Sequence, residues 1–187
     1  MKKYFIILFL SICCSLSSFA QLPREFLGFK LGVSKKSEVL NSFKGKGYSC
    51  EPVPSLNNIY RVVGGLWEYC DIEWPILMVG FQYDILYEIA FGTNIKTTSS
   101  LEDFGEIVET VDEYLSDNYI EYIDTDYINK KGIFADNVSS DFEIVMYSDK
   151  KTSTYYAFDH EKGKESFFVY HVDIFLSSMK WVEENHK

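Results

Sequence analysis

The 187-residue chain carries 18 Lys and Arg residues against 28 Asp and Glu residues, a formal net charge of −10. A surface so negative repels phosphate backbones and anionic lipids, which argues against nucleic acid and against polybasic docking to membranes. Aromatic residues make up 17% of the chain, enough to fill sheet cores and also to build a partner-binding surface.

Residues 1–20 have the build of a secretory signal peptide. Lys2 and Lys3 precede an apolar run over residues 4–12, and small residues lead to Ala20, after which we expect cleavage. The apolar run falls short of the roughly 20 residues that span a bilayer, and no later segment is both long enough and uncharged. The sequence thus predicts an exported protein, periplasmic or extracellular after cleavage, with no transmembrane segment.

Cleavage would leave two cysteines, Cys50 and Cys70, because Cys13 and Cys14 lie in the signal. In an oxidising compartment an even pair predicts a structural disulfide, worth roughly 3 kcal/mol for a loop of this length. A nucleophilic cysteine is the functional alternative, but no local signature supports it. Two free buried thiols are the remaining alternative.

The first predicted helix follows Ser34, which occupies the N-cap position. Val39, Leu40 and Phe43 form its narrow apolar stripe, and Gly45 and Gly47 are expected to end the helix. The region from residue 48 to 91 then changes to the period-two pattern of antiparallel strands, with a turn near Asp84. The side chains expected on one face of the last two strands are Leu77, Val79, Phe81, Tyr83, Ile85, Tyr87, Ile89 and Phe91.

A second helix has the strongest pattern in the chain. Ser99 and Glu102 fit a capping box at its start. Its apolar stripe, at spacings of three and four, consists of Leu101, Phe104, Val108, Val111 and Leu115. The helix surface opposite this stripe is acidic. An acidic surface is typical of a solvated helix face, and an acidic docking face is the alternative.

Alternating segments around residues 119–126, 142–147, 155–159 and 167–176 predict further strands. Lys162 and Gly163 are expected at the tip of a hairpin. That register places Glu161 opposite Lys164, His160 opposite Glu165 and His171 opposite Thr154. The buried face of the last strand is predicted to hold Phe168, Tyr170, Val172, Ile174 and Leu176, followed by a short helix from Ser178 with Trp181 as its anchor.

The order of elements predicts an α+β fold in which two main helices pack on antiparallel sheet. We expect residues 21–187 to form a single α+β domain. Because a helix followed by strands occurs twice, two repeats over 21–96 and 97–187 are a further hypothesis, although the halves show no residue-by-residue match.

Two resemblances bear on this chain. The stretch Phe26 to Gly32, then Gly64-Gly65-Leu66-Trp67 and Leu86-Tyr87-Glu88-Ile89, resembles small exported proteins of unknown function from Gram-negative gut bacteria. The repeated helix-then-sheet order is similar to the tandem α+β architecture of β-lactamase inhibitor proteins. The second likeness concerns topology alone, and neither resemblance supplies a functional residue.

His171 and Asp173 are the best candidate polar pair, because they point to the same face of one strand. His160 and His171 lie about 20 Å apart at roughly 3.3 Å per residue and cannot share a metal ion. We interpret His171 and Asp173 as a pair on the solvent side of an edge-like strand. An acid-base pair in an envelope hydrolase is the alternative, with the carboxylates near Asp71 as its other candidates.

No catalytic, cofactor-binding or metal-binding motif passes a test of spacing. Asp124 to Asp126 begin like a calcium loop, but Ile128 and Asn129 stand where a ligand and a glycine are needed. The sequence therefore favours an exported, non-catalytic binding protein that contacts a protein or glycan through an aromatic-rich sheet face. An envelope hydrolase and a proteinaceous enzyme inhibitor are the alternatives.

Overall fold

The computed structural model describes residues 22–54, 56–94, 101–118, 144–148, 151–161 and 164–185. Within these ranges it contains three helices and antiparallel strands, which confirms the predicted α+β class. In chain order the elements are β1 (Glu25–Phe26), β2 (Phe29–Lys30), α2 (Lys36–Gly45), β3 (Ser49–Pro52), β4 (Ile59–Val63), β5 (Trp67–Tyr69), β6 (Ile72–Trp74), β7 (Ile76–Gln82), β8 (Ile85–Asn94), α3 (Leu101–Asn118), β9 (Ile144–Ser148), β10 (Thr152–Glu161), β11 (Lys164–Asp173) and α5 (Ile174–Asn185).

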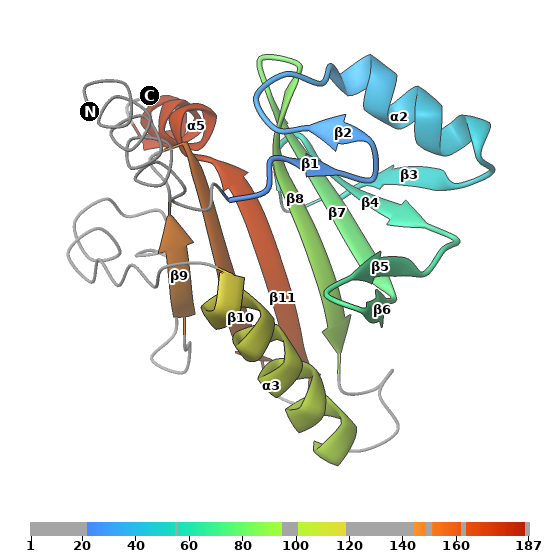
Figure 1. Cartoon of the computed structure of the whole chain (residues 1–187). Helices are drawn as coiled ribbons and strands as arrows, with labels where there is room; N and C mark the ends of the chain where they lie inside the picture. The colour runs from blue at the N-terminus through green and yellow to red at the C-terminus, as the bar shows by residue number, and fades with distance from the viewer. Residues whose placement is uncertain are drawn as a thin grey trace, which may run out of the picture.

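Both halves of the chain contribute to one seven-stranded sheet with the order β3-β4-β7-β8-β11-β10-β9 (Figure 1). All of its strand pairs are antiparallel. The halves meet through β8 and β11, the last strand of each, so that the pairing of these two strands joins the helix-then-sheet units. Whether the units arose by duplication stays a prediction.

The main core lies between one face of this sheet and the elements in front of it in Figure 1, which are β1, β2, α2 and α3. We call this side of the sheet the first face. Val111 and Leu115 of α3 are fully buried there, as the helical stripe predicted. The core also contains Phe26, Phe29, Leu31, Val39, Phe43, Trp67, Trp74, Leu77, Val79, Phe81, Leu86, Ile89, Phe91, Tyr156, Phe167 and Val169.

The hairpin of β10 and β11 has the predicted register. Glu161 pairs with Lys164 and Thr154 pairs with His171. The prediction for the buried face of β11 was wrong, however, because Phe167, Val169 and His171 are the side chains that are fully buried. β11 lies between β8 and β10 in the middle of the sheet, so its odd-numbered residues face the main core.

Both predicted helix starts near the sheet need correction. α2 begins after Lys35, whose backbone N–H donates to Glu38 Oε2 at 3.1 Å, and Ser34 Oγ instead accepts from the Lys30 backbone N–H. α5 begins at Ile174, four residues before Ser178, so Ile174 belongs to a helix and not to the final strand.

A β-bulge in β8 moves one aromatic ring to the other face of the sheet. Phe81 pairs with Leu86 while Gly80 pairs with Glu88, which leaves Tyr87 without a partner residue in the register. The Tyr87 side chain therefore packs in a second, smaller apolar cluster, and not with Ile89 and Phe91 as the alternation predicted. That smaller cluster also contains Ile59, Tyr155 and Val172, with Met78, Tyr170 and Leu176 against it.

The predicted disulfide is not formed, since Cys50 and Cys70 are both free thiols. Cys50 lies half-buried on β3, at the edge of the large sheet. Cys70 is buried in the tight turn between β5 and β6, where it and Asp71 adopt positive φ angles of 54° and 57°. Trp67 and Trp74 of the two-stranded sheet β5-β6 are buried in the main core. Their packing, and not a disulfide, holds this small sheet in place.

Candidate functional site

The predicted pair of His171 and Asp173 lies beneath the N-terminal segment 22–32, which we call the strap. The His171 ring is fully buried and stacks on Phe26 with ring centroids 4.1 Å apart. Rings of Tyr69 and Phe91 meet its edges. The interpretation of a solvent-facing pair on an edge-like strand was therefore wrong, because β11 is a central strand and the strap covers this end of it.

The polar contacts of the His171 ring are incomplete. Nδ1 lies 2.9 Å from Thr154 Oγ1 on the neighbouring strand. Nε2 is buried without a hydrogen-bond partner among the described residues. Burial lowers the pKa of His171 to about 3, so the ring is neutral at pH 7. A ring so enclosed cannot exchange protons with a substrate, which removes it as a general base.

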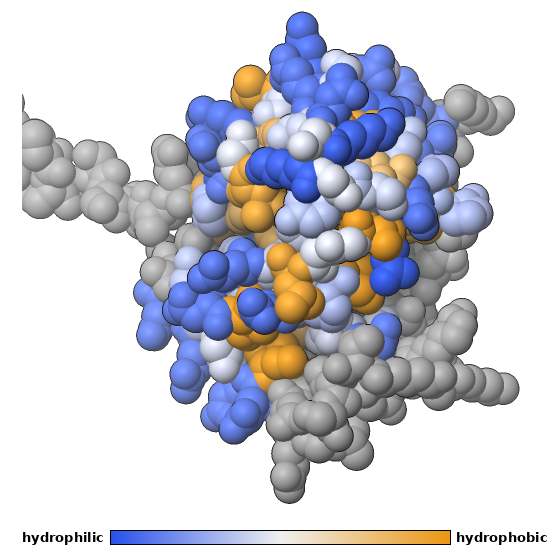
Figure 2. All heavy atoms as spheres, turned by 90° about the vertical axis from the view of Figure 1, so that its right-hand side faces the viewer, coloured by the Kyte–Doolittle hydropathy of each residue, from blue (hydrophilic) through white to orange (hydrophobic). Residues whose placement is uncertain are grey.

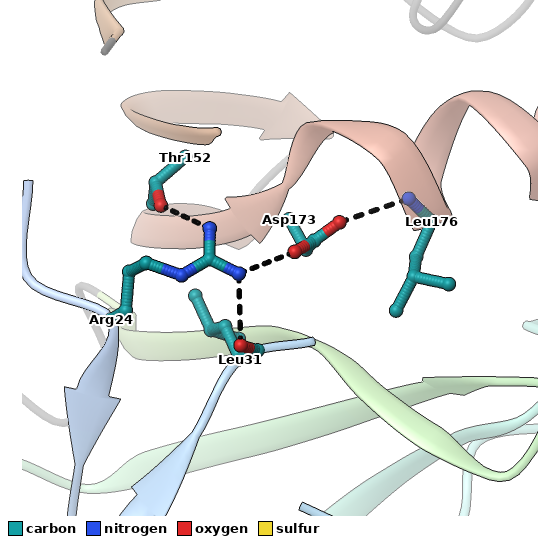
Figure 3. A network of polar contacts seen from close by, with 5 residues as sticks. All are labelled: Arg24, Leu31, Thr152, Asp173 and Leu176. Atoms are coloured by element: carbon teal, nitrogen blue, oxygen red, sulfur yellow. Dashed lines mark hydrogen bonds and ion pairs between the residues drawn. The ribbon is translucent and has the colours of Figure 1, made fainter. Parts of the chain in front are cut away.

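Asp173 takes part in a network that joins the strap to the sheet (Figure 3). Arg24 Nη2 contacts Asp173 Oδ2 at 2.6 Å and also donates to the backbone oxygen of Leu31 at 2.9 Å. Arg24 Nη1 donates to Thr152 Oγ1 at 2.8 Å. The other oxygen of Asp173 accepts from the Leu176 backbone N–H at 3.0 Å, so Asp173 is also the N-cap of α5. These groups satisfy one another, and we assign the network a structural role.

The remaining sequence candidates do not assemble into a site. Asp71 and Glu73 lie exposed on the β5-β6 hairpin, where Glu73 pairs in register with Glu68. Across the described parts of the chain, no three His, Cys, Asp or Glu side chains gather as metal ligands. The segment from Asp124 to Asp126 lies outside the described residues.

The second face of the sheet, opposite α2 and α3, carries a strip of aromatic rings. Tyr155 and Tyr170 stack with centroids 4.7 Å apart and an interplanar angle of 14°, and Phe168 follows at 5.8 Å from Tyr170. Phe168 lies directly over Gly92, because a Cβ atom at that glycine would come within 2.2 Å of the ring. Phe168 and Tyr170 keep partial exposure to solvent.

The register explains why the strip is continuous. Met78, Ala90, Tyr170 and Tyr155 form one row across four adjacent strands, from β7 to β10. Met78 is half-buried, like Tyr170, whereas the small Ala90 between them is fully buried. A band of methionine and aromatic side chains therefore crosses the centre of the second face.

A polar group from α5 borders this strip. Lys180 Nζ donates to the Tyr87 hydroxyl at 2.8 Å, and its charge acts favourably on Glu88 next to that tyrosine. Burial nevertheless raises the pKa of Glu88. The sequence analysis did not identify Glu88 as a candidate, although a single acidic residue inside the apolar strand Ile85–Asn94 is a signal that could have found it.

The side of the molecule that carries α2 and β3 offers a different surface. Figure 2 shows hydrophobic side chains there in small groups, interspersed with hydrophilic ones. Leu66, in the connection before β5, is 60% exposed. Scattered exposed apolar residues of this kind are common on protein surfaces.

Comparison with known proteins gives no relative: no family model, no curated protein and no solved structure matches this chain. Among the described helices, none is long and apolar enough to cross a lipid bilayer.

Proposed function

We propose that this chain is an exported, non-catalytic binding protein that contacts a partner protein through the second face of its sheet. The aromatic strip carries the proposal. Phe168 and Tyr170 stand partly exposed on a central strand, while the opposite face of the same strand is buried in the main core. Tyrosine and methionine are enriched in the centres of protein interfaces, and tyrosine is among the residues that contribute most of the binding energy.

The shape of the strip favours a protein over a glycan. Gly80, Ala90 and Gly92 of the middle strands are buried beneath larger side chains, since Ile59 and Tyr87 cover Gly80 and Phe168 covers Gly92. The rings lie in one band over them, with Arg61 exposed in register with Met78 at one end. A broad band with a charged rim suits the flat contact surface of a folded protein. A glycan site would need convergent polar groups around a stacking ring.

The residues that the hydrolase alternative requires do not form an accessible site. His171 and Asp173 lie under the strap, and Asp71 is exposed on a hairpin turn. An enzyme inhibitor remains compatible with the proposal, since an inhibitor is a binding protein whose partner is an enzyme.

The test uses the chain from residue 21 as bait in an envelope extract, with captured proteins identified by mass spectrometry and remeasured in purified form. A double variant, Met78→Ser with Tyr170→Ser, removes two partly exposed side chains of the strip. We expect it to weaken binding of the purified partner at least tenfold, about 1.4 kcal/mol. The matched control is Phe175→Ser on α5, a 70% exposed aromatic residue that is not part of the strip.

Three outcomes distinguish the possibilities. Loss of binding in the double variant, with binding retained in Phe175→Ser, supports the second face as the contact surface. Equal binding by the double variant overturns it. Capture that disappears when the extract is treated with glycosidases would assign a glycan ligand and overturn the protein partner.

A further inference from the structure

The strap is attached to the large sheet by few backbone hydrogen bonds. Its strands β1 and β2 pair only with each other, as a separate two-stranded sheet. Its end is tied to β8 by one bond, from the Gly32 N–H to the Leu86 oxygen at 2.8 Å. Lifting the strap would therefore break no ladder hydrogen bond of the seven-stranded sheet.

Side chains hold the strap closed, and His171 is the centre of their contact. Phe26 stacks on the His171 ring at 4.1 Å, and Arg24 binds Asp173, which lies two residues further along the same face of β11. Leu22 and Leu31 of the strap are also buried. The closed strap thus excludes water from the imidazole, whose exposed fraction is 0%.

A protonated His171 does not fit this environment. An imidazolium has two N–H donors, yet only Nδ1 has an acceptor, Thr154 Oγ1, in the described structure. The Asp173 carboxylate, two residues further along β11, is not free to accept from the ring, because its oxygens already bind the Arg24 guanidinium and the Leu176 N–H. The other group that meets the ring and can titrate is the Tyr69 phenol.

We propose that the strap is an acid-sensitive cover, which lifts locally from the sheet when His171 takes up a proton. Lifting lets water reach Nε2, which has no hydrogen-bond partner among the described residues in the closed form. It also exposes Phe26 and Phe91, which are buried in the closed form, beside the half-buried Tyr69, and so creates a second aromatic surface.

Proton linkage gives the expected change of the strap's opening constant with pH. The pKa of His171 is about 3 under the strap and returns toward 6.5 when the ring is hydrated. Because the closed form binds the proton more weakly, closure is favoured fully above pH 6.5 and progressively less as the pH falls toward 3. The opening constant should therefore rise by about tenfold per pH unit through this window, or about 100-fold from pH 7.5 to pH 4.5.

Hydrogen exchange measured by mass spectrometry, corrected for the intrinsic pH dependence of amide exchange, tests the proposal on the whole mature chain. We expect peptides over residues 22–32 to lose protection between pH 7.5 and 4.5, while peptides over Ile76–Gln82 keep theirs. In His171→Gln, which retains a hydrogen-bonding group but cannot titrate, strap protection should not depend on pH. Simultaneous loss in both regions would show global acid unfolding and overturn the proposal, as would unchanged pH dependence in His171→Gln.

A second variant guards against failure of His171→Gln to fold. Phe26→Leu removes the stacked ring and keeps the titrating group. It should raise strap exchange at every pH while retaining the dependence of about tenfold per pH unit. If strap exchange in both the wild type and Phe26→Leu is independent of pH from 7.5 to 4.5, His171 does not control the strap and the proposal fails.

Discussion

Arg24 Nη2 lies 2.6 Å from Asp173 Oδ2, and this ion pair joins the strap to the last strand of the sheet. Its two side chains are only 22% and 10% exposed. Because Asp173 also caps α5, one carboxylate orients both the strap and the C-terminal helix. The first half of the chain is thereby fastened across the second half at a point that is far away in sequence.

Removing the cation should destabilise the fold. Arg24→Ala leaves the Asp173 carboxylate buried with the Leu176 N–H as its hydrogen-bond donor, and we expect the free energy of unfolding to fall by about 2–3 kcal/mol. Lys30→Ala, an exposed lysine of the same strap, changes the net charge equally and should cost less than about 0.5 kcal/mol. Urea denaturation of the two variants gives the comparison. Similar midpoints for both would show that the ion pair contributes little.

The ion pair also explains the glycine at position 32. Gly32 has φ of +76°, and a Cβ atom there would lie 2.6 Å from Asp173 Oδ2 and 2.8 Å from Arg24 Nη2. Gly32→Ala should cost about 2–4 kcal/mol, from backbone strain and from displacement of the pair. Gly28→Ala is the matched control, because its φ is +84° but its Cβ would meet nothing within 4 Å. Equal losses in thermal denaturation would attribute the whole effect to the backbone.

The burial of Cys50 and Cys70 predicts how their thiols react. Burial raises the pKa of Cys70 to about 12 and also raises that of Cys50, so both remain thiols at pH 8. The chain from residue 21, left unreduced, should yield two sulfhydryls in a denaturing thiol assay. In the native state the half-buried Cys50 should react first and Cys70 much more slowly. A denatured sample with no free sulfhydryl would establish the bond that the structure lacks.

Glu88 predicts a pH dependence opposite to that of His171. Burial raises its pKa, so the folded state binds the proton more tightly than the unfolded state, and stability falls as the pH rises through the raised value. Glu88→Gln should therefore increase the free energy of unfolding at pH 7 and have little effect at pH 4. Lys180→Met, which removes the nearby cation, should decrease it at pH 7. Destabilisation by Glu88→Gln at pH 7 would mean that the contacts of Glu88 with Tyr87 and Lys180 outweigh its burial.

Local patterns in the sequence determined most of the secondary structure. The stripe that ends in Val111 and Leu115 identified α3, and turn residues at 162 and 163 set the register that brings Thr154 opposite His171. These features depend on neighbours a few residues apart, through helical periodicity and through the geometry of a tight turn. They could therefore be read from the chain alone.

Tertiary structure decided which side chains are buried and which meet. Alternation identifies the two faces of β11 but not which one packs on the main core, and the place of β11 between β8 and β10 buried His171. The bulge that turns Tyr87 toward Lys180 depends on pairing with β7, which the local pattern does not contain. Contacts such as Arg24 with Asp173 arise from strand order and long-range packing, and no short stretch of sequence encodes them.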